Sequence, residues 1–417
     1  MPTEKLKWFR DAKYGLFIHW GLYAIPGGEW DGRFLPRGTE WIMKRLAIPL
    51  RDYRKLAEQF CPDDFDPYFY VRRAKQWGMK YLVFTAKHHD GFAMFDTKVS
   101  DYSVMHTPYG RDVVRQLADA CAAEGLTFCV YYSQMQDWEH PDGNGNTLDY
   151  DPAKQDFSRY FYEKALPQVR ELLMNYGKLG MIWFDTPYDM PVALCRELAD
   201  AVRACQPDCL ISGRIGYGLG DFREAADNSV PLLSRPDPWE SPMTLNRTWG
   251  FSRRDENFKS PSLVLENLTR VVGKGGNLLL NVGPDATGKI PVRSDEVLCE
   301  VGRWLEKNGE SIYGTSPAPD FPYLNPWGET TYNAETLMLY LHVKQYPPEP
   351  YRLRLLGLKT PVTDVRLLTG EPLVYQQSYD PARDEHRLYV TLPDKCPDAD
   401  DTVVAVSLDG EISVQTL

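Results

Sequence analysis

The chain of 417 residues lacks several features that would place it in a membrane, in a secretory pathway or in a redox system. Its first residues contain no apolar run of the kind found in a secretory leader, and no later run approaches the ~20 apolar residues that span a bilayer. Its eight cysteines include no CxxC pair, and several lie in apolar segments, which is typical of reduced thiols. We therefore expect a cytoplasmic protein.

An excess of positive charge is also missing, since the net charge is −11. This argues against nucleic acid or an anionic membrane as the main partner. No glycine fingerprint for a dinucleotide follows the first apolar run. A glycine-rich segment at 273–277 ends a helical pattern and enters a strand, the reverse of a phosphate-binding loop. The sequence shows no obvious metal shell either, so we predict neither a cofactor nor a bound metal.

What is present is an alternation of apolar runs and helical periodicity over the first three quarters of the chain. Such alternation implies a mainly parallel sheet with crossover helices. Without a dinucleotide fingerprint, a closed barrel is favoured over a doubly wound sheet. We predict an irregular (β/α) TIM-like barrel over residues 1–317, with strands at 14–18, 80–86, 127–132, 181–184 and 278–282 and helices at 112–123, 157–176, 191–204 and 262–272.

The pattern changes near residues 312–326, where proline, tyrosine and asparagine replace the helical periodicity. Beyond this point, short apolar runs alternate with proline, glycine and aspartate turns. Strands are predicted at 337–343, 351–358, 362–368, 386–392 and 402–406. We expect a small antiparallel β domain over residues 318–417, which contributes apolar packing rather than chemistry.

Histidines follow two of the predicted strands. The motif Lys-His-His-Asp-Gly-Phe (87–92) comes directly after a β-branched apolar run, and Gly-Leu-Phe-Ile-His-Trp-Gly (15–21) also ends in a histidine and a glycine. A buried imidazole needs hydrogen-bond partners on both nitrogens. Each could be a satisfied structural histidine, but the recurrence favours a polar pocket at the C-terminal rim of a parallel barrel.

Two carboxylates accompany these histidines. Asp185 ends the apolar run Met-Ile-Trp-Phe (181–184), and its alternative role is to cap a following helix, because Pro187 is a helix-starting residue. Glu240 lies between bulky aromatic residues in a proline-rich stretch, where a raised pKa would suit a proton donor, although most glutamates are solvated. Two pocket carboxylates with histidines and aromatics point to glycoside hydrolysis.

Successive motifs resemble the α-L-fucosidases of glycoside hydrolase family 29 from about Trp8 to Val292. They are Gly-Leu-Phe-Ile-His-Trp-Gly (15–21), Glu-Trp-Ile-Met (40–43), Thr-Ala-Lys-His-His-Asp-Gly-Phe (85–92), Tyr-Tyr-Ser (131–133), Ile-Trp-Phe-Asp (182–185), Trp-Glu (239–240), Thr-Trp-Gly-Phe (248–251) and Gly-Gly-Asn-Leu-Leu-Leu-Asn-Val-Gly-Pro (275–284). The resemblance implies a distorted (β/α) barrel, a C-terminal β-sandwich and a retaining mechanism.

The resemblance also implies roles for individual residues. Asp185 takes the place of the nucleophile, and Glu240 is the preferred proton donor, with Glu29, Asp237 and Glu40 as alternatives. Thr186 stands where the family commonly has glycine, which predicts a less permissive backbone there. The implied substrate-binding residues are His19, Glu40, Trp41, His88, His89, Tyr132, Trp183 and Arg214.

The chemistry of fucose explains why residues of these types would bind it. Its hydroxyls require mixed donors and acceptors, and its methyl group requires an apolar wall, for which Phe17, Trp183 and Phe251 are candidates. Arg214 follows an apolar run and is expected to approach the substrate or Asp185, with a structural ion pair as the alternative.

The predicted function is a retaining exo-α-L-fucosidase acting on terminal α-L-fucosides of oligosaccharides or glycoconjugates. Three alternatives remain. The first is an exo-glycosidase of other sugar specificity, and the second is a non-catalytic fucose-binding protein. The third is a metal-dependent hydrolase using His19, His88, His89 and Asp185 as ligands.

Overall fold

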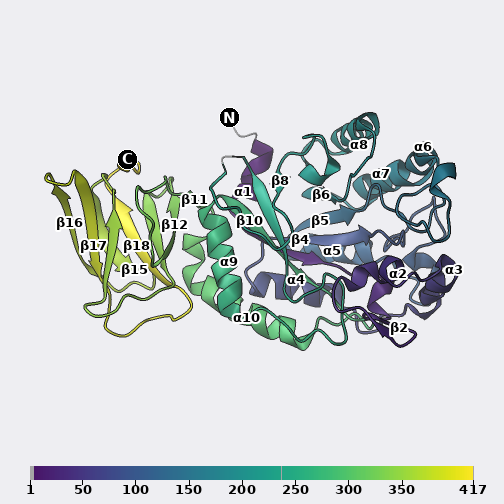
Figure 1. Ribbon diagram of the computed structural model, residues 1–417, viewed down its shortest axis with the longest axis horizontal. Helices are drawn as coiled ribbons and strands as arrows, with labels where there is room; N and C mark the ends of the chain where they lie inside the picture. The colour runs from purple at the N-terminus through teal and green to yellow at the C-terminus, as the bar shows by residue number, and fades with distance from the viewer. Residues whose placement is uncertain (1–3, 236, 417) are drawn as a thin grey trace.

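The computed structural model describes residues 4–235 and 237–416, which form a parallel barrel followed by an antiparallel β domain (Figure 1). The barrel sheet contains parallel strands in the order β7-β6-β5-β4-β1-β10-β9-β8. Their bounds are β1 Tyr14–Ile18, β4 Tyr81–Lys87, β5 Thr127–Tyr132, β6 Met181–Phe184, β7 Leu210–Ile211, β8 Arg223–Glu224, β9 Trp239–Thr244 and β10 Gly276–Val282. The predicted TIM-like architecture is therefore confirmed.

The barrel is irregular at the seam between its two shortest strands, β7 and β8. In the described residues no ladder of backbone hydrogen bonds joins these two strands, which form the edges of the curled sheet. The Gly213 amide instead donates to the Glu224 carboxylate at 2.9 Å, and the Asp221 amide donates to the Ile211 carbonyl at 2.8 Å. Side-chain and loop contacts therefore close the barrel at this seam.

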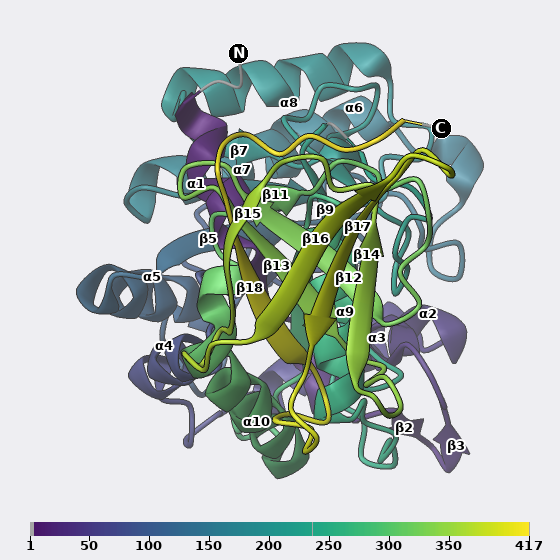
Figure 2. The ribbon, with the colours of Figure 1, turned by 90° about the vertical axis from the view of Figure 1, so that its left-hand side faces the viewer.

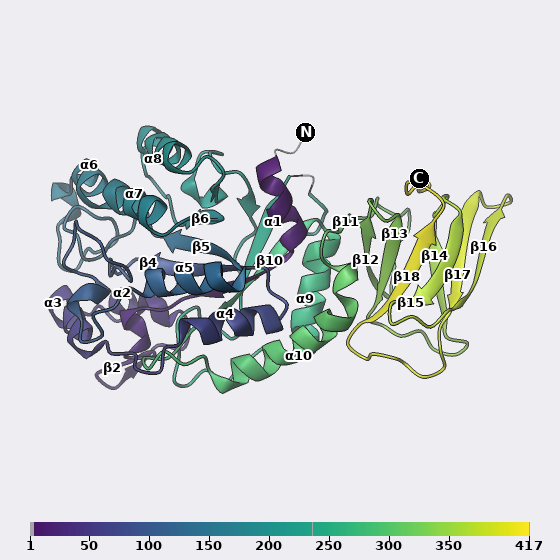
Figure 3. The ribbon, with the colours of Figure 1, turned by 180° about the vertical axis from the view of Figure 1, so that it is seen from behind.

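Helices cover the outside of the barrel, as the views in Figures 1 and 3 show. Local signals explain their ends: the Asp112 side chain accepts from the Arg115 amide at the start of α5, and Gly125 ends this helix in the left-handed conformation at φ 70°. The helices are α1 Lys7–Ala12, α2 Ile42–Arg45, α3 Leu50–Tyr53, α4 Pro67–Gln76, α5 Val113–Glu124, α6 Phe157–Tyr160, α7 Leu166–Asn175, α8 Val192–Cys205, α9 Pro261–Gly273 and α10 Val292–Asn308.

The C-terminal part is a sandwich of two antiparallel sheets, and Figure 2 shows the smaller sheet in front of the larger one. The larger sheet has the order β11-β12-β13-β18-β15, and the smaller has the order β14-β17-β16. The bounds are β11 Ser316–Pro317, β12 Gly328–Asn333, β13 Met338–Val343, β14 Arg352–Leu356, β15 Val362–Leu367, β16 Val374–Asp380, β17 Glu385–Thr391 and β18 Thr402–Leu408. Strand β11 thus lies just before the expected boundary between residues 317 and 318.

Strand alternation divides the larger sheet between two cores. Leu339 and Leu341 of β13 pack into the sandwich, whereas Tyr340, between them, packs into the core of the barrel domain. Helices α9 and α10 lie between the barrel and the sandwich in Figures 1 and 3. The Trp304 indole of α10 donates to the Asp401 carbonyl at 3.0 Å. The sandwich is therefore packed against the barrel on the side of these two helices.

Composition predicts no membrane-spanning run and reduced cysteines. The helices of the described residues include none that combines the length and the apolar character needed to cross a membrane. All eight cysteines are free thiols, and Cys61 is exposed while Cys121, Cys129, Cys195 and Cys209 are buried.

Candidate active site

A polar cavity of about 530 Å³ lies at the C-terminal ends of the barrel strands. This is the end at which TIM-barrel enzymes carry their active sites. Each side chain reaches the cavity from the end of a strand or from the loop that follows it. Its lining includes Phe17, His19, Arg37, Gly38, Glu40, Trp41, Arg45, His88, His89, Tyr131, Trp183, Asp185, Thr186, Tyr188, Arg214, Asp227, Asn228, Thr244, Arg247 and Trp249.

Asp185, directly after β6, is held by donors on both of its carboxylate oxygens. Arg214 Nη1 lies 3.0 Å from Oδ1, and the Tyr131 hydroxyl donates to Oδ2 at 2.9 Å. The Asp185 amide donates to Gln134 Oε1 at 2.8 Å, which fixes the backbone as well. The side chain is 12% exposed. One carboxylate is therefore presented to the cavity in a defined orientation, beside a permanent positive charge.

The hydrogen bonds of two histidines determine their tautomers. His19 Nδ1 lies 2.7 Å from Asn281 Oδ1, whose amide nitrogen already donates to the Trp249 carbonyl. His89 Nδ1 lies 2.7 Å from the Ser133 hydroxyl, which itself donates to a backbone carbonyl. Each Nδ1 must therefore carry the proton, and each Nε2 is left as an acceptor. Burial lowers the pKa of His19 to about 3 and that of His89 well below its usual value, so both rings are neutral.

His88 completes this polar layer. Its ring is stacked on Tyr131 at a centroid distance of 5.6 Å and an interplanar angle of 16°. Its Nδ1 is buried and has no hydrogen-bond partner among the described residues. Burial lowers the pKa of His88 well below its usual value, so this imidazole is also neutral.

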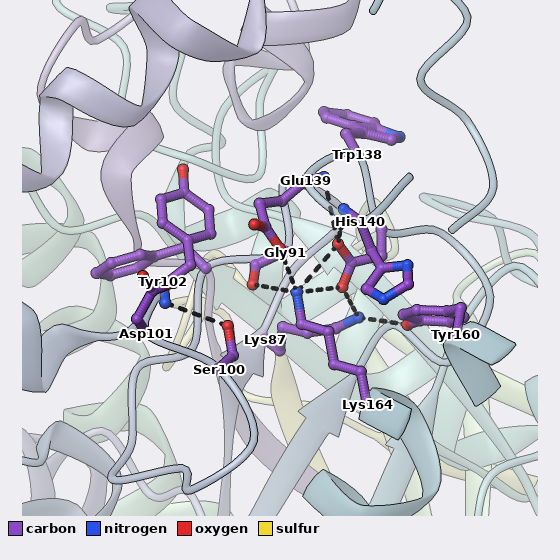
Figure 4. A network of polar contacts seen from close by, with 12 residues as sticks. Lys87, Gly91, Ser100, Asp101, Tyr102, Trp138, Glu139, His140, Tyr160 and Lys164 are labelled. Carbon is purple, nitrogen blue, oxygen red and sulfur yellow. Dashed lines mark hydrogen bonds and ion pairs between the residues drawn. The ribbon is translucent and has the colours of Figure 1, made fainter. Parts of the chain in front are cut away.

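A buried ionic cluster includes Lys87, the residue before the histidine pair, and is drawn in Figure 4. Lys87 Nζ lies 2.9 Å from Asp137, and Lys164 lies 3.0 Å from the same carboxylate and 2.8 Å from Glu139. The two ammonium groups lower the pKa of Asp137, despite burial that acts in the opposite direction. Because the Trp138 amide donates to the His89 carbonyl at 2.8 Å, this cluster ties the 133–146 loop to the end of β4.

Glu40 and Trp41 reach the cavity from the loop after β1. Glu40 Oε2 accepts from the amides of Trp249 and Gly250 at 3.2 and 3.0 Å and from the Thr248 hydroxyl at 3.2 Å. Burial raises the pKa of Glu40, and these donors oppose that effect. The Trp41 ring lies 4.8 Å from the His89 ring. The expected positions of both residues at the pocket are thus observed.

Glu240 does not lie where a proton donor is required. It belongs to β9, a strand that sequence analysis missed, and its side chain is 0% exposed inside the barrel. Its oxygens accept from the Tyr81 hydroxyl at 2.5 Å and from the Trp183 indole at 2.9 Å. Thr244, four residues later, lines the cavity, and four strand residues span roughly 13 Å. Glu240 therefore lies beneath Trp183, below the cavity, and burial raises its pKa to about 7.

Tyr132, which was also expected to bind substrate, does not line the cavity. Its hydroxyl donates to Gln168 of α7 at 2.8 Å, outside the barrel sheet, whereas Tyr131 faces the interior and reaches Asp185. Successive residues of a strand point to opposite faces, so a shift of one residue exchanges inside and outside. Tyr131, and not Tyr132, lines the cavity.

A second cavity carboxylate, Asp227, was not identified from the sequence. It follows the short strand β8, its side chain is 43% exposed, and it pairs with Arg214 Nη2. Arg214 thus contacts Asp227 through one terminal nitrogen and Asp185 through the other. One guanidinium therefore contacts both carboxylates. The guanidinium carbon of Arg214 lies 4.8 Å from the centroid of the Trp183 ring. Arg214 approaches Asp185 as expected.

The remaining alternatives for the proton donor lie outside the cavity, except Glu40. Glu29 pairs with Arg254, and Asp237 is an exposed side chain 4.0 Å from Arg223. Of the residues expected to form the apolar wall, Phe17 and Trp183 line the cavity, while Phe251 does not and Trp249 does. Trp249 stands in the Thr-Trp-Gly-Phe motif, which was the available signal for it.

Thr186, which follows Asp185, adopts the left-handed conformation at φ 49°. This region is costly for a β-branched residue and readily adopted by glycine. Its hydroxyl accepts from the Gln136 amide at 3.0 Å, so a side-chain hydrogen bond accompanies the strained backbone.

Within the described residues, no group of three or more His, Cys, Asp or Glu side chains is arranged to hold a metal ion.

Comparison with known proteins gives a consistent result. The α-L-fucosidase family model matches residues 2–310. The chain is 36% identical to α-L-fucosidase isoenzyme 1 from Paenibacillus thiaminolyticus, with a TM-score of 0.88 and coverage of 97% of this chain and 99% of that one. It is 30% identical to the tissue α-L-fucosidase of Bos taurus over 332 residues, which cover 74% of this chain and 69% of that protein.

One further solved structure concerns the course of the reaction. It is a family 29 α-L-fucosidase from Bacteroides thetaiotaomicron, trapped as a covalent intermediate with 2-fluoro-fucosyl fluoride. It is 29% identical, with a TM-score of 0.87 and coverage of 97% of this chain and 96% of that one. From the extent of these matches, the chain belongs to the α-L-fucosidases of glycoside hydrolase family 29.

Proposed function

We propose that this retaining α-L-fucosidase uses Asp185 as its nucleophile and Asp227 as its proton donor. The observation that carries the proposal is the guanidinium of Arg214, which contacts both carboxylates. In retaining enzymes the two carboxyl groups are about 5–5.5 Å apart. Contacts to the two terminal nitrogens of one guanidinium place the carboxylates of Asp185 and Asp227 close to each other, as a retaining mechanism requires. Asp227 thereby replaces Glu240 in the role of acid and base.

The fucose ring is proposed to lie above Trp183 with its hydroxyls facing the polar layer. His19 Nε2 and His89 Nε2 accept from sugar hydroxyls, because both Nδ1 protons are engaged elsewhere. His88 and Glu40 contribute further polar contacts, and Trp41 packs at the side. Phe17 and Trp183 form the apolar surface for the methyl group. A site that pairs with hydroxyls in this way discriminates strongly against a sugar that lacks them.

The reaction then has two steps. A carboxylate oxygen of Asp185 attacks the anomeric carbon while Asp227 transfers its proton to the departing oxygen, so that a fucosyl–aspartate ester forms as the glycosidic bond breaks. Water attacks the same carbon in the second step, Asp227 takes a proton from it, and the bond to Asp185 breaks. Two inversions restore the original configuration. Arg214 and Tyr131 orient Asp185 throughout.

The substrates are proposed to be terminal α-L-fucosides of oligosaccharides or glycoconjugates. A panel of aryl glycosides tests the sugar specificity, and proton NMR identifies the anomer that is released first. The proposal is supported if only the fucoside is hydrolysed rapidly and the α-anomer of L-fucose is released first. Release of the β-anomer, or faster turnover of another glycoside, would contradict it.

The role of Asp227 is tested with Asp227→Ala. General acid catalysis contributes about 10²–10⁴-fold, and its contribution grows with the basicity of the leaving group. The variant should lose most activity on fucosylated oligosaccharides and much less in the first step with an activated aryl fucoside. Azide should speed breakdown of the intermediate and give a product of retained configuration.

The matched control is Asp237→Ala, which removes an exposed loop carboxylate outside the cavity. Equal losses of Asp227→Ala on both classes of substrate, without an effect of azide, would exclude Asp227 as the proton donor.

A further inference from the structure

Three exposed arginines line the active-site cavity, in a protein whose net charge is −11. Arg37, Arg45 and Arg247 all line the cavity and are exposed. Among the described residues, the guanidinium–carboxylate pairs at this cavity belong to Arg214, and none involves the other three. We call Arg37, Arg45 and Arg247 the arginine collar. In the described residues, none of these three guanidiniums is paired with a carboxylate, although Arg45 lies near enough to Glu40 to lower the pKa of that carboxyl.

The guanidinium of Arg45 is held in place by groups of the protein itself. Its Nη1 donates to the Arg37 carbonyl at 2.7 Å, and its charge lies 6.0 Å from the Trp41 ring. Gly38 has φ 64°, and a Cβ atom there would lie 2.6 Å from Arg45 Nη1. The absence of a side chain at Gly38 thus makes room for this guanidinium. The Arg45 guanidinium is thus fixed by the backbone of the loop that carries Arg37.

Arg247 is held by a neutral partner. With the Asn257 amide oriented to satisfy its hydrogen bonds, its oxygen accepts from Arg247 Nε at 2.6 Å and from Nη2 at 3.2 Å. An amide positions a guanidinium without cancelling its charge. Arg247 therefore resembles Arg45 in being oriented by neutral groups and left free to bind an anion.

We propose that the arginine collar binds an anionic group on the leaving part of the substrate, so that the preferred substrates are acidic fucosylated saccharides. The inference rests on the proposed function, in which the fucose occupies the floor of the cavity and the leaving group its mouth. Arginine forks match the planar oxygen pairs of carboxylates and the oxygens of sulfate esters. A neutral sugar makes no use of the charge of three guanidiniums, whereas an anionic group can pair with them.

The proposal is tested with paired aryl α-L-fucosides that carry a meta-sulfonate or the neutral meta-sulfonamide. For each, kcat/KM is measured in the full-length protein at about 0.05 and 0.5 M salt. The wild type should prefer the sulfonate, and salt should reduce that preference several-fold, because exposed charges are screened within ~3–10 Å. A second pair, meta-carboxylate and meta-carboxamide, distinguishes the two kinds of anion.

Substitutions of the arginines test whether the arginine collar causes the preference for the sulfonate. One exposed ion pair is worth about two- to fivefold. Arg45→Gln should thus reduce the sulfonate-to-sulfonamide ratio by this amount, and the triple variant of Arg37, Arg45 and Arg247 should reduce it by about tenfold or more. Ratios between variant and wild type cancel the intrinsic reactivities of the two leaving groups. Arg303→Gln, which removes an exposed arginine of α10, is the matched control and should leave the ratio unchanged.

The outcomes separate this inference from the proposed function. If neither aryl fucoside is hydrolysed, the proposed function itself fails. If both are hydrolysed and the triple variant leaves their ratio and its salt dependence unchanged, the arginine collar does not bind an anion. A change of equal size in Arg303→Gln would show only an effect of net charge, and would also overturn the proposal.

Discussion

The barrel interior contains two layers in which a tyrosine and one further donor hold a carboxylate. In the upper layer, Tyr131 and Arg214 hold Asp185, at 2.9 and 3.0 Å. In the lower layer, Tyr81 and the indole of Trp183 hold Glu240, at 2.5 and 2.9 Å. The Trp183 side chain belongs to both, since its ring lies against the arginine and its N–H reaches the glutamate.

The two layers differ in charge and in access rather than in residue type. Asp185 faces the cavity and has a guanidinium as its partner, whereas Glu240 has only neutral donors and no exposed surface. Burial raises the pKa of Glu240 to about 7, so its carboxyl is largely protonated in mildly acidic solution. A nucleophile requires the first environment. The second is suited to supporting the aromatic floor on which the sugar is proposed to lie.

Removing the carboxylate of Asp185, in the upper layer, should have the largest effect on activity. Asp185→Gly should lower the turnover of aryl fucosides by at least about 10⁴-fold, as loss of a covalent nucleophile does elsewhere. Azide should partly restore the release of the aryl group by attacking from the vacated side, which gives an inverted fucosyl azide detectable by NMR. Asp189→Gly, at an exposed carboxylate outside the cavity, is the control. Near-normal activity of Asp185→Gly without azide would remove it from this role.

Removing the hydroxyl group of Tyr131 should have an intermediate effect on activity, and removing that of Tyr132 should have almost none. Tyr131→Phe removes a hydrogen bond to a carboxylate, a bond worth about 1.5–3 kcal/mol, so kcat/KM should fall about 10- to 100-fold. Tyr132→Phe, one residue later, removes the bond to Gln168. It should lower the free energy of unfolding by about 1 kcal/mol and leave kcat/KM within about twofold. Equal effects of the two substitutions on kcat/KM would contradict the assignment of Tyr131 to the cavity.

Substitution in the lower layer should have the smallest effect on activity. In Glu240→Gln the side-chain oxygen can accept from Trp183 and the amide can donate to Tyr81, which mimics the protonated carboxyl. We expect kcat to remain within about threefold of the wild type. A loss comparable to that of Asp185→Gly would mean that Glu240 takes part in the chemistry.

The same variant should change how stability depends on pH. The pKa of Glu240 in the folded protein, about 7, is higher than its ordinary value of 4.5. Its stabilising contribution is therefore complete below about pH 4.5 and is lost as the pH rises through about 7. Glutamine cannot ionise, so urea midpoints should fall less between pH 5 and pH 8 in Glu240→Gln than in the wild type. Equal declines would refute the buried, protonated state.

Much of the upper layer could be predicted because its residues follow long, strongly apolar strands. The run before Asp185 and the run before His88 correspond closely to β6 and β4. Carboxyl ends of parallel strands meet at one rim, which explains why these side chains converge. Glu40, Trp41 and Arg214 came from the family resemblance, and the cavity contains all three.

The errors have identifiable physical causes. Pro242 and the surrounding turn-like residues concealed β9, so the depth of Glu240 in the barrel could not be judged. Tyr131 and Tyr132 are adjacent and chemically equal, and only the strand register decides which one faces inward. Asp227 follows a strand of two residues, which is too short to produce a pattern. Its role is visible only through its contact with Arg214.

The seam between β7 and β8 has a consequence for how firmly the two carboxylates of the site are anchored. Arg214 follows β7 and Asp227 follows β8, so their ion pair crosses a gap that no backbone ladder spans in the described residues. An insertion or deletion after β8 would break no interstrand bond across that gap. By contrast, Asp185 follows β6, which is paired with strands on both sides. Among the described residues, the proposed proton donor Asp227 is thus anchored from the β9 side alone, where the next residue, Asn228, donates its amide to the Pro242 carbonyl at 3.0 Å, while Asp185 is anchored by strands on both sides.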